Sequence, residues 1–375
     1  MKLFPKKSTP SKILLGHLYS FGDCLYATVV ARQIKEDFPG CHLTWAIGSK
    51  WRSVLNGNPH IDEIWEVPFN GQEASSVWVQ FEREALKRKK QGDFDEVYFT
   101  QFFPSRIYNY DGMIRSSIFR GYPNPITVPV SPVLRLFPNE VDNVRQFADR
   151  CHLADIRHVL LFECAPKSGQ SFVTPDFALA VSRRLVDSIP DISIVLSSNV
   201  PVVSNHPRIV DGSVLSFREN AELTKYCTLL VGCSSGITWI STSDWARPLP
   251  MIQLIKRDAV FYAPVAYDFD YWGLSTDMIL EMSSSTVDGL VACIDIALKE
   301  GIYAAKLRFN ENIPFSFKTY VEFLFYYVKH FRFITAFMMI KNNVTVHGLH
   351  MQRIMQSLIE MIKRRLAKFS TKLAV

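Results

Sequence analysis

The residues best placed for chemistry follow a short apolar segment near the amino terminus. Residues 13–16 read Ile-Leu-Leu-Gly, the turn 20–23 reads Ser-Phe-Gly-Asp, and an apolar stretch follows at 25–30. A buried strand, a glycine-containing turn and a helix start form the opening unit of an α/β domain, where ligands bind at the carboxyl ends of strands. Asp23 could act as a general base that takes a proton from an attacking hydroxyl. It could equally cap the helix by accepting hydrogen bonds from the first amides.

A second candidate turn lies at residues 232–236, which read Gly-Cys-Ser-Ser-Gly. The pattern predicts a strand over 229–232 and a helix from residue 237. Amides and hydroxyls in such a turn can converge on an anion at a helix start. Ser234, Ser235 and Gly236 are therefore candidate phosphate ligands. A plain small-residue turn with a serine cap would give the same letters.

A third candidate is the loop over residues 164–172, which follows a predicted strand at 158–162. It contains Lys167, Ser168 and Gln170, and such a loop can wrap a pyrophosphate with Lys167 as the cation. A flexible surface loop is the alternative. The chain has neither G-x-x-x-x-G-K-[ST] nor G-x-G-x-x-G, so we expect neither a Walker loop nor a dinucleotide dehydrogenase.

Arginines and histidines complete the inventory of possible ligands. An anionic acceptor could be bound by three arginines, Arg106, Arg115 and Arg120. Solvated surface arginines would give the same sequence pattern. The nine histidines are scattered, and no H-E-x-x-H motif or Cys/His cluster is present. We expect no metal site and no cofactor.

The elements that must position these residues alternate along the chain. Strand and helix patterns alternate before and after the proline-rich segment 121–138, which predicts two α/β domains with mostly parallel sheets. We expect domains over residues 1–140 and 141–300, and a helical extension over 301–375. A cleft between two such domains would be a natural ligand site.

The positive charge is concentrated in the carboxyl-terminal extension. From residue 313 onward there are ten Lys+Arg and two Asp+Glu, a net charge of +8, which leaves −2 for the remainder. Aromatic residues lie among these bases, and residues 351–372 show helical apolar spacing. The extension could lie in a membrane interface or could be a packed helical cap with a basic outer face. The slightly acidic body argues against a nucleic-acid partner.

The remaining composition bounds the class of protein. The 375 residues are 48% apolar and 21% charged, which suits a folded chain with two cores. Seven cysteines without a C-x-x-C pair indicate reduced thiols in a cytoplasmic protein. The basic amino terminus lacks a following apolar segment, and no stretch reaches the length of a membrane-spanning helix.

The order of these motifs resembles glycosyltransferase family 9, the heptosyltransferases of lipopolysaccharide core synthesis. The family's amino-terminal pattern corresponds to Lys-Ile-Leu-Leu at 12–15, Gly-Asp at 22–23, Phe-Pro-Gly at 38–40 and Asn-Pro-His-Ile-Asp at 58–62. Residues 229–236 look like the family's V-G-x-D-[ST]-G stretch, and Arg-Pro at 247–248 falls at a matching place. The resemblance covers about residues 12–255.

The resemblance implies a GT-B architecture, with two Rossmann-like domains facing across a cleft and no catalytic metal. It implies an inverting transfer in which Asp23 is the base and the second domain holds an ADP-heptose-like nucleotide-sugar donor. The acceptor would be a lipid-linked or core oligosaccharide. The protein would be cytoplasmic, with a peripheral contact to the inner membrane through its extension.

Several departures from the family pattern lie on the donor side. Ser234 stands where the family has Asp, Trp239 stands where it has His, and Gln170 stands where it has Lys. Lys167 could replace that lysine. These changes keep two other readings open, namely a non-catalytic scaffold of a glycan-assembly complex and a GT-B-like nucleotide-sugar epimerase.

Overall fold

The computed structural model describes residues 11–257, 263–311, 313 and 318–348, together with Met355, Ile359 and Ile362. The first ten residues and most of the helix predicted over 351–372 lie outside these ranges. The chain forms two compact units, Met1–Asn109 with Arg115–Leu136, and Tyr110–Ile114 with Phe137–Val375. The short segment Tyr110–Ile114 thus belongs with the second unit although the first unit surrounds it in sequence.

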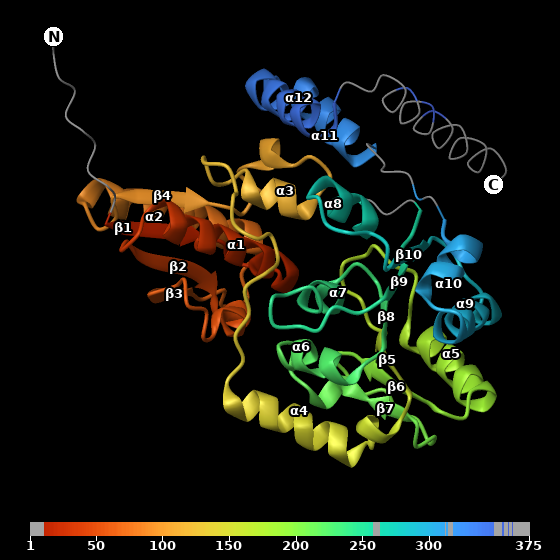
Figure 1. Cartoon of the computed structure of the whole chain (residues 1–375). Coiled ribbons are helices and arrows are strands. Elements are labelled where there is room, and N and C mark those ends of the chain that lie inside the picture. Colours follow the sequence, from red (N-terminus) through yellow and green to blue (C-terminus); the bar gives the residue numbers. More distant parts are fainter. Residues whose placement is uncertain are drawn as a thin grey trace, which may run out of the picture. The chain divides into compact units, whose positions relative to one another are not determined.

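The first unit contains a parallel four-stranded sheet in the order β3-β2-β1-β4 (Figure 1). Its strands are β1 (Lys12–Gly16), β2 (His42–Gly48), β3 (Glu63–Val67) and β4 (Glu96–Phe99). Its helical elements are α1 (Phe21–Asp37), η1 (Ser49–Leu55), α2 (Ala74–Gln91), η2 (Ile107–Asn109) and α3 (Ile114–Phe119), the last of which crosses the border between the units.

Burial of apolar side chains explains why α2 packs on this sheet. Val77, Trp78 and Phe81 on α2 are buried in one cluster with Leu14 of β1 and Phe99 of β4. The Trp78 and Phe99 rings meet edge to face, with 5.7 Å between centroids, a favoured aromatic geometry. The α2 contacts fix the strands β1 and β4, whose carboxyl ends carry the first candidate site.

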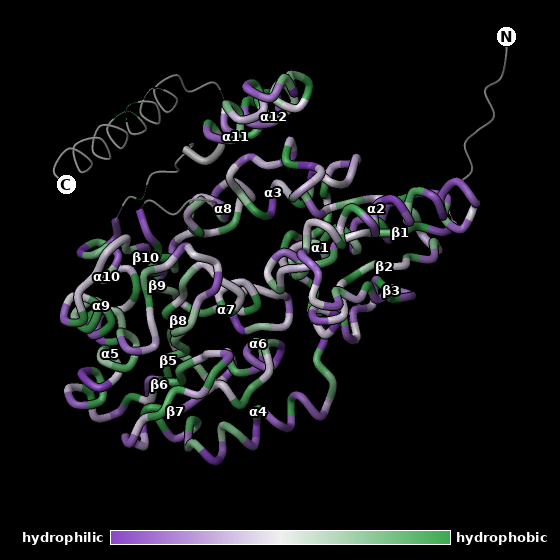
Figure 2. Tube along the Cα trace, turned by 180° about the vertical axis from the view of Figure 1, so that it is seen from behind, coloured by the Kyte–Doolittle hydropathy of each residue, from purple (hydrophilic) through white to green (hydrophobic). Residues whose placement is uncertain are grey.

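The second unit contains a parallel six-stranded sheet in the order β10-β9-β8-β5-β6-β7. Figure 2 shows β5 and β6 as largely hydrophobic, as expected for strands buried on both faces. The strands are β5 (His158–Glu163), β6 (Ile192–Ser197), β7 (Ile209–Asp211), β8 (Leu229–Gly232), β9 (Met251–Leu254) and β10 (Ile279–Met282).

The second unit contains helices of very different lengths. Three of them, α5, α9 and α10, contribute apolar side chains to one core with the strands. The helical elements are α4 (Pro138–Arg150), η3 (Leu153–Asp155), α5 (Pro175–Ser188), η4 (Gly212–Val214), α6 (Glu219–Leu223), η5 (Thr224–Tyr226), α7 (Gly236–Ile240), α8 (Val265–Tyr271), α9 (Val287–Lys299), α10 (Ile302–Phe309), α11 (Lys318–Lys329) and α12 (Phe333–His347).

Both sheets reverse their strand order beside their first strand. In the first unit the chain runs from β1 outward to β3 and then returns to place β4 on the other side of β1. In the second unit it runs from β5 to β7 and returns to place β8 beside β5. Open parallel sheets bind ligands at the carboxyl ends of strands at such switch points. The relevant positions are the ends of β1 and β4 in one unit and of β5 and β8 in the other.

Candidate active site

Asp23 lies immediately after the switch point of the first sheet. Ser20 precedes α1 with φ 75°, a left-handed value that is uncommon outside glycine. Asp23 is the third residue of α1, and Gly22, which we expected in the turn, is helical. The capping interpretation of Asp23 is therefore wrong, because Ser20 holds the N-cap position.

The surroundings of Asp23 favour its neutral form. The residue is partly buried, and burial raises the pKa of its carboxyl group from 3.8 to about 7. Within the described residues, no hydrogen bond or ion pair reaches this carboxyl group. Burial and the charge of Asp23 also raise the pKa of Tyr19. A carboxyl group that titrates near neutrality can take or give a proton under physiological conditions.

The segment between β1 and α1 is held by residues that follow β4. Gln101 accepts hydrogen bonds from the amides of Leu18 and Tyr19 at 3.1 and 3.3 Å. The Tyr19 hydroxyl donates to the carbonyl of Phe103 at 2.8 Å. His17 lies 2.9 Å from the Thr100 hydroxyl through Nδ1, and burial lowers the pKa of His17 to about 3. This support orders the turn that leads into α1 and Asp23.

The three candidate acceptor arginines all have contacts inside the first unit. Arg106 pairs with Glu82 at 2.6 Å and lies over the Phe99 ring. Arg115 is only 1% exposed and lies over the Tyr26 ring at 4.8 Å. Arg120 donates to the Asn109 carbonyl and the Ser116 hydroxyl, both at 2.9 Å. None of the three is the solvated surface arginine of the alternative interpretation, and their role toward an acceptor stays a prediction.

At the switch point of the second sheet, a protein carboxylate holds the turn 232–236. Glu163, the last residue of β5, is 3% exposed. Its oxygens accept hydrogen bonds from the amides of Cys233 at 2.8 Å and Ile237 at 3.0 Å, and from the Thr238 hydroxyl at 2.8 Å. Burial raises the pKa of Glu163, while these hydrogen bonds lower it. The amides of Cys233 and Ile237 are thus already hydrogen-bonded to a side-chain carboxyl group, that of Glu163.

Sequence reasoning missed Glu163 because it ended the strand at residue 162. The sequence does contain a signal for this role. Glu163 directly follows the apolar strand 158–162, and the alternating pattern places that strand next to the strand 229–232, which ends in a glycine turn. Gly232 is required there, because a Cβ atom would lie 2.4 Å from Gln253 Nε2 and 2.5 Å from the Thr238 hydroxyl.

Ser234 differs from its neighbours because its hydroxyl is buried without a partner. The residue is 1% exposed and has φ 49°. Its amide donates to Gln253 Oε1 at 3.0 Å, and its Oγ has no hydrogen-bond partner among the described residues. Ser235 is the N-cap of α7, and Gly236 is its first residue. A buried polar atom without a partner is uncommon and often marks a functional position.

The loop 164–172 contacts this turn through Gln170. Gln170 is 2% exposed, and its Nε2 lies 3.5 Å from the Ser234 carbonyl oxygen. Its own carbonyl accepts from the amide of Lys256 at 2.6 Å, and its amide donates to the Ser168 hydroxyl at 3.3 Å. Lys167 is exposed and has no ion pair or hydrogen bond within the described residues. The structure therefore brings together Gln170 and Ser234, with Lys167 and Ser168 on the same loop.

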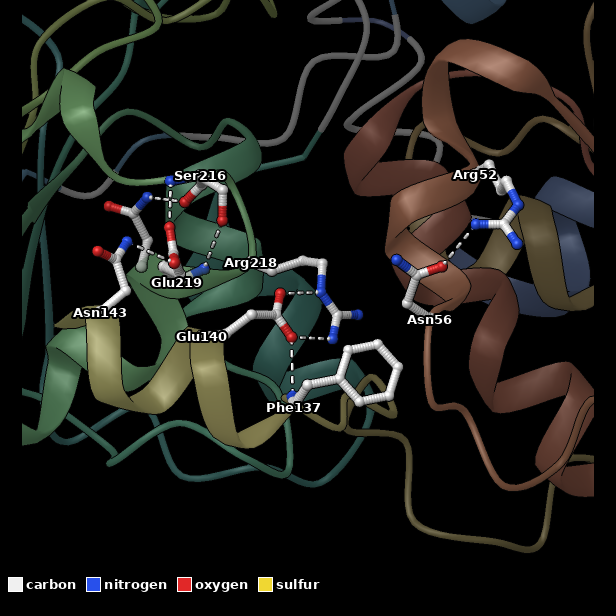
Figure 3. A network of polar contacts seen from close by, with 9 residues as sticks. Arg52, Asn56, Phe137, Glu140, Asn143, Ser216, Arg218 and Glu219 are labelled. Atoms are coloured by element: carbon white, nitrogen blue, oxygen red, sulfur yellow. Dashed lines mark hydrogen bonds and ion pairs between the residues drawn. The ribbon is translucent and has the colours of Figure 1, made fainter.

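A polar network joins α4 to the start of α6 in the second unit (Figure 3). Arg218 donates to Glu140 at 2.7 and 2.9 Å, and Asn143 donates to Glu219 at 2.8 Å. The Phe217 ring, which precedes Arg218 in the chain, would lie 3.0 Å from a Cβ atom on Gly236. The first residue of α7 therefore has little room for a larger side chain beside this ring.

Among the residues that the structure describes, no group of three or more His, Cys, Asp or Glu is placed to hold a metal ion. Within the same part of the chain, no helix has both the length and the apolar character needed to cross a bilayer.

The fold of the chain occurs in solved glycosyltransferases. A family 9 glycosyl transferase from Veillonella parvula DSM 2008 superposes with a TM-score of 0.54 and 16% identity, over 77% of this chain and 97% of that chain. The ADP-heptose lipopolysaccharide heptosyltransferase II of E. coli superposes with a TM-score of 0.51 and 14% identity, over 77% and 99%. No family model matches the chain, and no curated protein matches its sequence.

These comparisons define the class of fold. The chain has the α/β, GT-B type fold with two parallel sheets and carboxyl-terminal helices, as the sequence predicted. The resemblance to the family 9 glycosyltransferases is confirmed at the level of the fold.

Proposed function

We propose that the protein is an inverting, metal-independent glycosyltransferase that moves a sugar, heptose in the first instance, from a nucleoside-diphosphate donor to a lipopolysaccharide-core or other surface-glycan acceptor. One observation carries the proposal: Asp23, whose pKa is raised to about 7, lies at the switch point of its sheet. The solved heptosyltransferase with the same fold is described as acting with ADP-heptose and lipopolysaccharide. That similarity supports an ADP-heptose-like donor here.

In the proposed reaction, ionised Asp23 takes the proton of the acceptor hydroxyl. The acceptor oxygen forms a bond to the anomeric carbon of the donor sugar, on the face opposite the diphosphate. The bond between that carbon and the diphosphate oxygen breaks, and its electron pair leaves with the nucleoside diphosphate. A single displacement of this kind inverts the anomeric configuration.

The leaving diphosphate needs positive charge and hydrogen-bond donors, and stabilising developing charge is commonly the largest contribution to catalysis. Lys167 is an exposed cation with no hydrogen bond or ion pair to any residue that the structure describes, and Ser168 follows it in the loop. The unpartnered Ser234 hydroxyl could donate a further hydrogen bond. We assign these three residues, with Gln170, Ser235 and Gly236, to donor binding, and Arg106, Arg115 and Arg120 to the acceptor side.

A second candidate function is a non-catalytic scaffold. Glu163 favours it, because this residue occupies two amides of the turn 232–236 that a phosphate could otherwise use. A scaffold would need neither a titrating carboxylate nor an unpaired lysine. We place the transferase first because Asp23 and Lys167 both have the properties that the reaction requires. We propose a cytoplasmic protein with a peripheral membrane position, where a lipid-linked acceptor would be found.

The test uses the purified full-length chain and a panel of ADP-, UDP- and GDP-sugars. We expect one nucleotide class to raise the thermal transition, and release of the nucleoside diphosphate when a core-oligosaccharide acceptor is added. Asp23→Asn should keep donor binding and lower turnover by about 10²–10⁴-fold. Glu36→Gln, which removes an exposed carboxylate from the same helix, is the matched control and should keep full turnover. If no nucleotide sugar binds, the transferase proposal is wrong and the scaffold function is favoured.

A further inference from the structure

The helices α11 and α12 form a hairpin whose tip carries an unusual number of exposed apolar side chains. Figures 1 and 2 both show the two helices side by side. Phe331 in the connection is 81% exposed, and Ile334 and Phe337 on α12 are 78% and 66% exposed. We call residues 325–340 the apolar tip, and its large exposed side chains are Phe325, Tyr326, Val328, Phe331, Phe333, Ile334, Phe337, Met338 and Ile340.

The base of the hairpin is firmly attached to the second unit. His347 lies 2.8 Å from the Tyr267 hydroxyl through Nδ1 and 2.7 Å from the Asp111 carbonyl through Nε2. Asn343 donates to the Tyr110 carbonyl at 3.4 Å, and the Tyr110 and Phe323 rings meet edge to face. The hairpin is therefore a built part of this unit, with its own buried contacts at the base.

Other side chains of the two helices are buried. These are Val321 and Tyr327 on α11 and Ala336 and Met339 on α12, and Val321 belongs to a core cluster with Met113 and Ala263 of the second unit. The buried contacts of the hairpin thus use a different set of side chains from the exposed ones. Soluble monomers rarely expose contiguous apolar patches of this kind, and such patches mark interaction surfaces.

Charge and length identify the partner of the apolar tip. From Val321 to His347 the basic residues are Lys329, Arg332 and Lys341, and the acidic residue is Glu322, a net charge of +2. A basic, aromatic surface attracts anionic lipids, whereas it would repel an identical surface on a second copy. Helices of 12 and 15 residues are too short to cross the bilayer. They suit a position in the membrane interface, where aromatic side chains are favoured.

We propose that the apolar tip docks on an anionic phospholipid bilayer, with its aromatic side chains at the boundary between headgroups and acyl chains and with Lys329 and Arg332 against the headgroups. This inference narrows the membrane contact expected for residues 301–375 to residues 325–340. It does not depend on the transfer reaction, because vesicle binding can be measured without donor or acceptor.

The test is flotation of the full-length chain with vesicles of phosphatidylcholine containing about one quarter phosphatidylglycerol. We expect the chain to bind these anionic vesicles and to bind vesicles of pure phosphatidylcholine more weakly. Binding to the anionic vesicles should fall when added salt shortens the Debye length from about 10 Å to about 3 Å. The triple variant Phe331→Ser, Ile334→Ser and Phe337→Ser should lower the partition coefficient at least about 100-fold, given the apolar area removed. Lys329→Gln with Arg332→Gln should lower binding to the anionic vesicles alone.

The matched control changes three equally exposed apolar residues outside the hairpin. Val203, Tyr303 and Leu307 are 79%, 68% and 73% exposed, and their triple change to Ser should leave binding within about twofold. Circular dichroism should show the same fold for both triple variants. The proposal is overturned if the wild-type protein does not bind anionic vesicles, or if the hairpin triple variant binds them as well as the wild type does. It is also overturned if light scattering shows a wild-type dimer that the triple substitution disrupts while neither protein binds vesicles.

Discussion

The Glu163 carboxylate accepts a hydrogen bond from the Thr238 hydroxyl at 2.8 Å, although 75 positions separate the two residues in the chain. This contact joins the end of β5 to the first turn of α7. Because the same carboxylate also bonds the amide of Cys233, it fixes the backbone on both sides of Ser234. The geometry of the proposed donor site therefore depends on a residue that need not touch the donor.

Replacing Glu163 by Gln should separate this positioning role from a direct one. The variant keeps the shape of the side chain, but its NH₂ group replaces an oxygen that accepts hydrogen bonds from the amides and the hydroxyl around it. At least one buried hydrogen bond is therefore lost. We expect a loss of about 1–3 kcal/mol in the free energy of unfolding, measured by urea denaturation. Thr238→Val removes the donor to Glu163 and a 3.2 Å acceptor of the Cys233 amide, but it leaves both amide hydrogen bonds of Glu163 in place, so it should cost less.

If Glu163 is a positioning residue, Glu163→Gln should weaken donor binding. Thr238→Val should then weaken donor binding as well, but to a smaller extent. A Glu163→Gln variant with unchanged stability and unchanged donor affinity would contradict the role assigned to this carboxylate.

The raised pKa of Asp23 predicts two different pH profiles. For activity, the base must be ionised in the free enzyme, so log kcat/KM should rise with unit slope below about pH 7 and become constant above it. For stability, the folded state holds the proton between 3.8 and about 7 while the unfolded chain loses it. The native state is therefore progressively destabilised as pH rises through this window, and the effect is constant above it.

Asp23→Asn tests the stability profile without any substrate. The amide cannot ionise, so the variant should unfold at a higher temperature than wild type at pH 8, and the difference should shrink toward zero near pH 4. Calorimetry across this range measures the difference. Parallel curves for the two proteins at every pH would show that the pKa of Asp23 is not raised by the fold. Glu36→Gln on the same helix should show no such trend.

The parts of the fold that could be predicted from the sequence are those whose signals are local. The boundaries of β8 match the expected strand 229–232, and Thr174 caps α5 through its hydroxyl, with Pro175 following as the first helical residue. Each of these depends on a few consecutive letters. The positions of Asp23 after β1 and of Ser234 after β8 could be predicted from a local signal of the same kind, a glycine-containing turn that follows an apolar run.

The parts that could not be predicted depend on contacts distant in sequence. Glu163 meets partners that are 70 or more positions away, so its role is not visible in its own strand. The buried Arg115 contacts Tyr26, which is 89 positions away. The strand β10 is not evident from its own four residues, which include Glu281 and pair with β9. Tertiary pairing decides such short segments more than local propensity does.

Ser234→Ala tests whether the unpartnered hydroxyl serves the donor. Because Oγ makes no hydrogen bond among the described residues, its removal should leave the free energy of unfolding unchanged within about 0.5 kcal/mol. If the hydroxyl donates to the diphosphate, donor affinity should fall about 10–100-fold by calorimetric titration. Ser182→Ala is the control, since the buried Ser182 hydroxyl donates within α5 at 2.7 Å. It should lower stability and spare affinity, and the reverse pattern would remove Ser234 from the donor site.

Lys167→Gln separates charge from structure on the loop 164–172. Lys167 is exposed and free of protein partners within the described residues, so the variant should keep the wild-type thermal transition. A cation that faces a diphosphate contributes about 1.5–3 kcal/mol to binding. The dissociation constant of the donor should therefore rise at least about tenfold, and it should depend less on salt than in the wild type. Lys90→Gln, which removes an equally exposed lysine from α2 of the first unit, should change neither property. Equal effects of the two substitutions would mean that the donor responds to net charge alone, and Lys167 would then have no specific place at the leaving group.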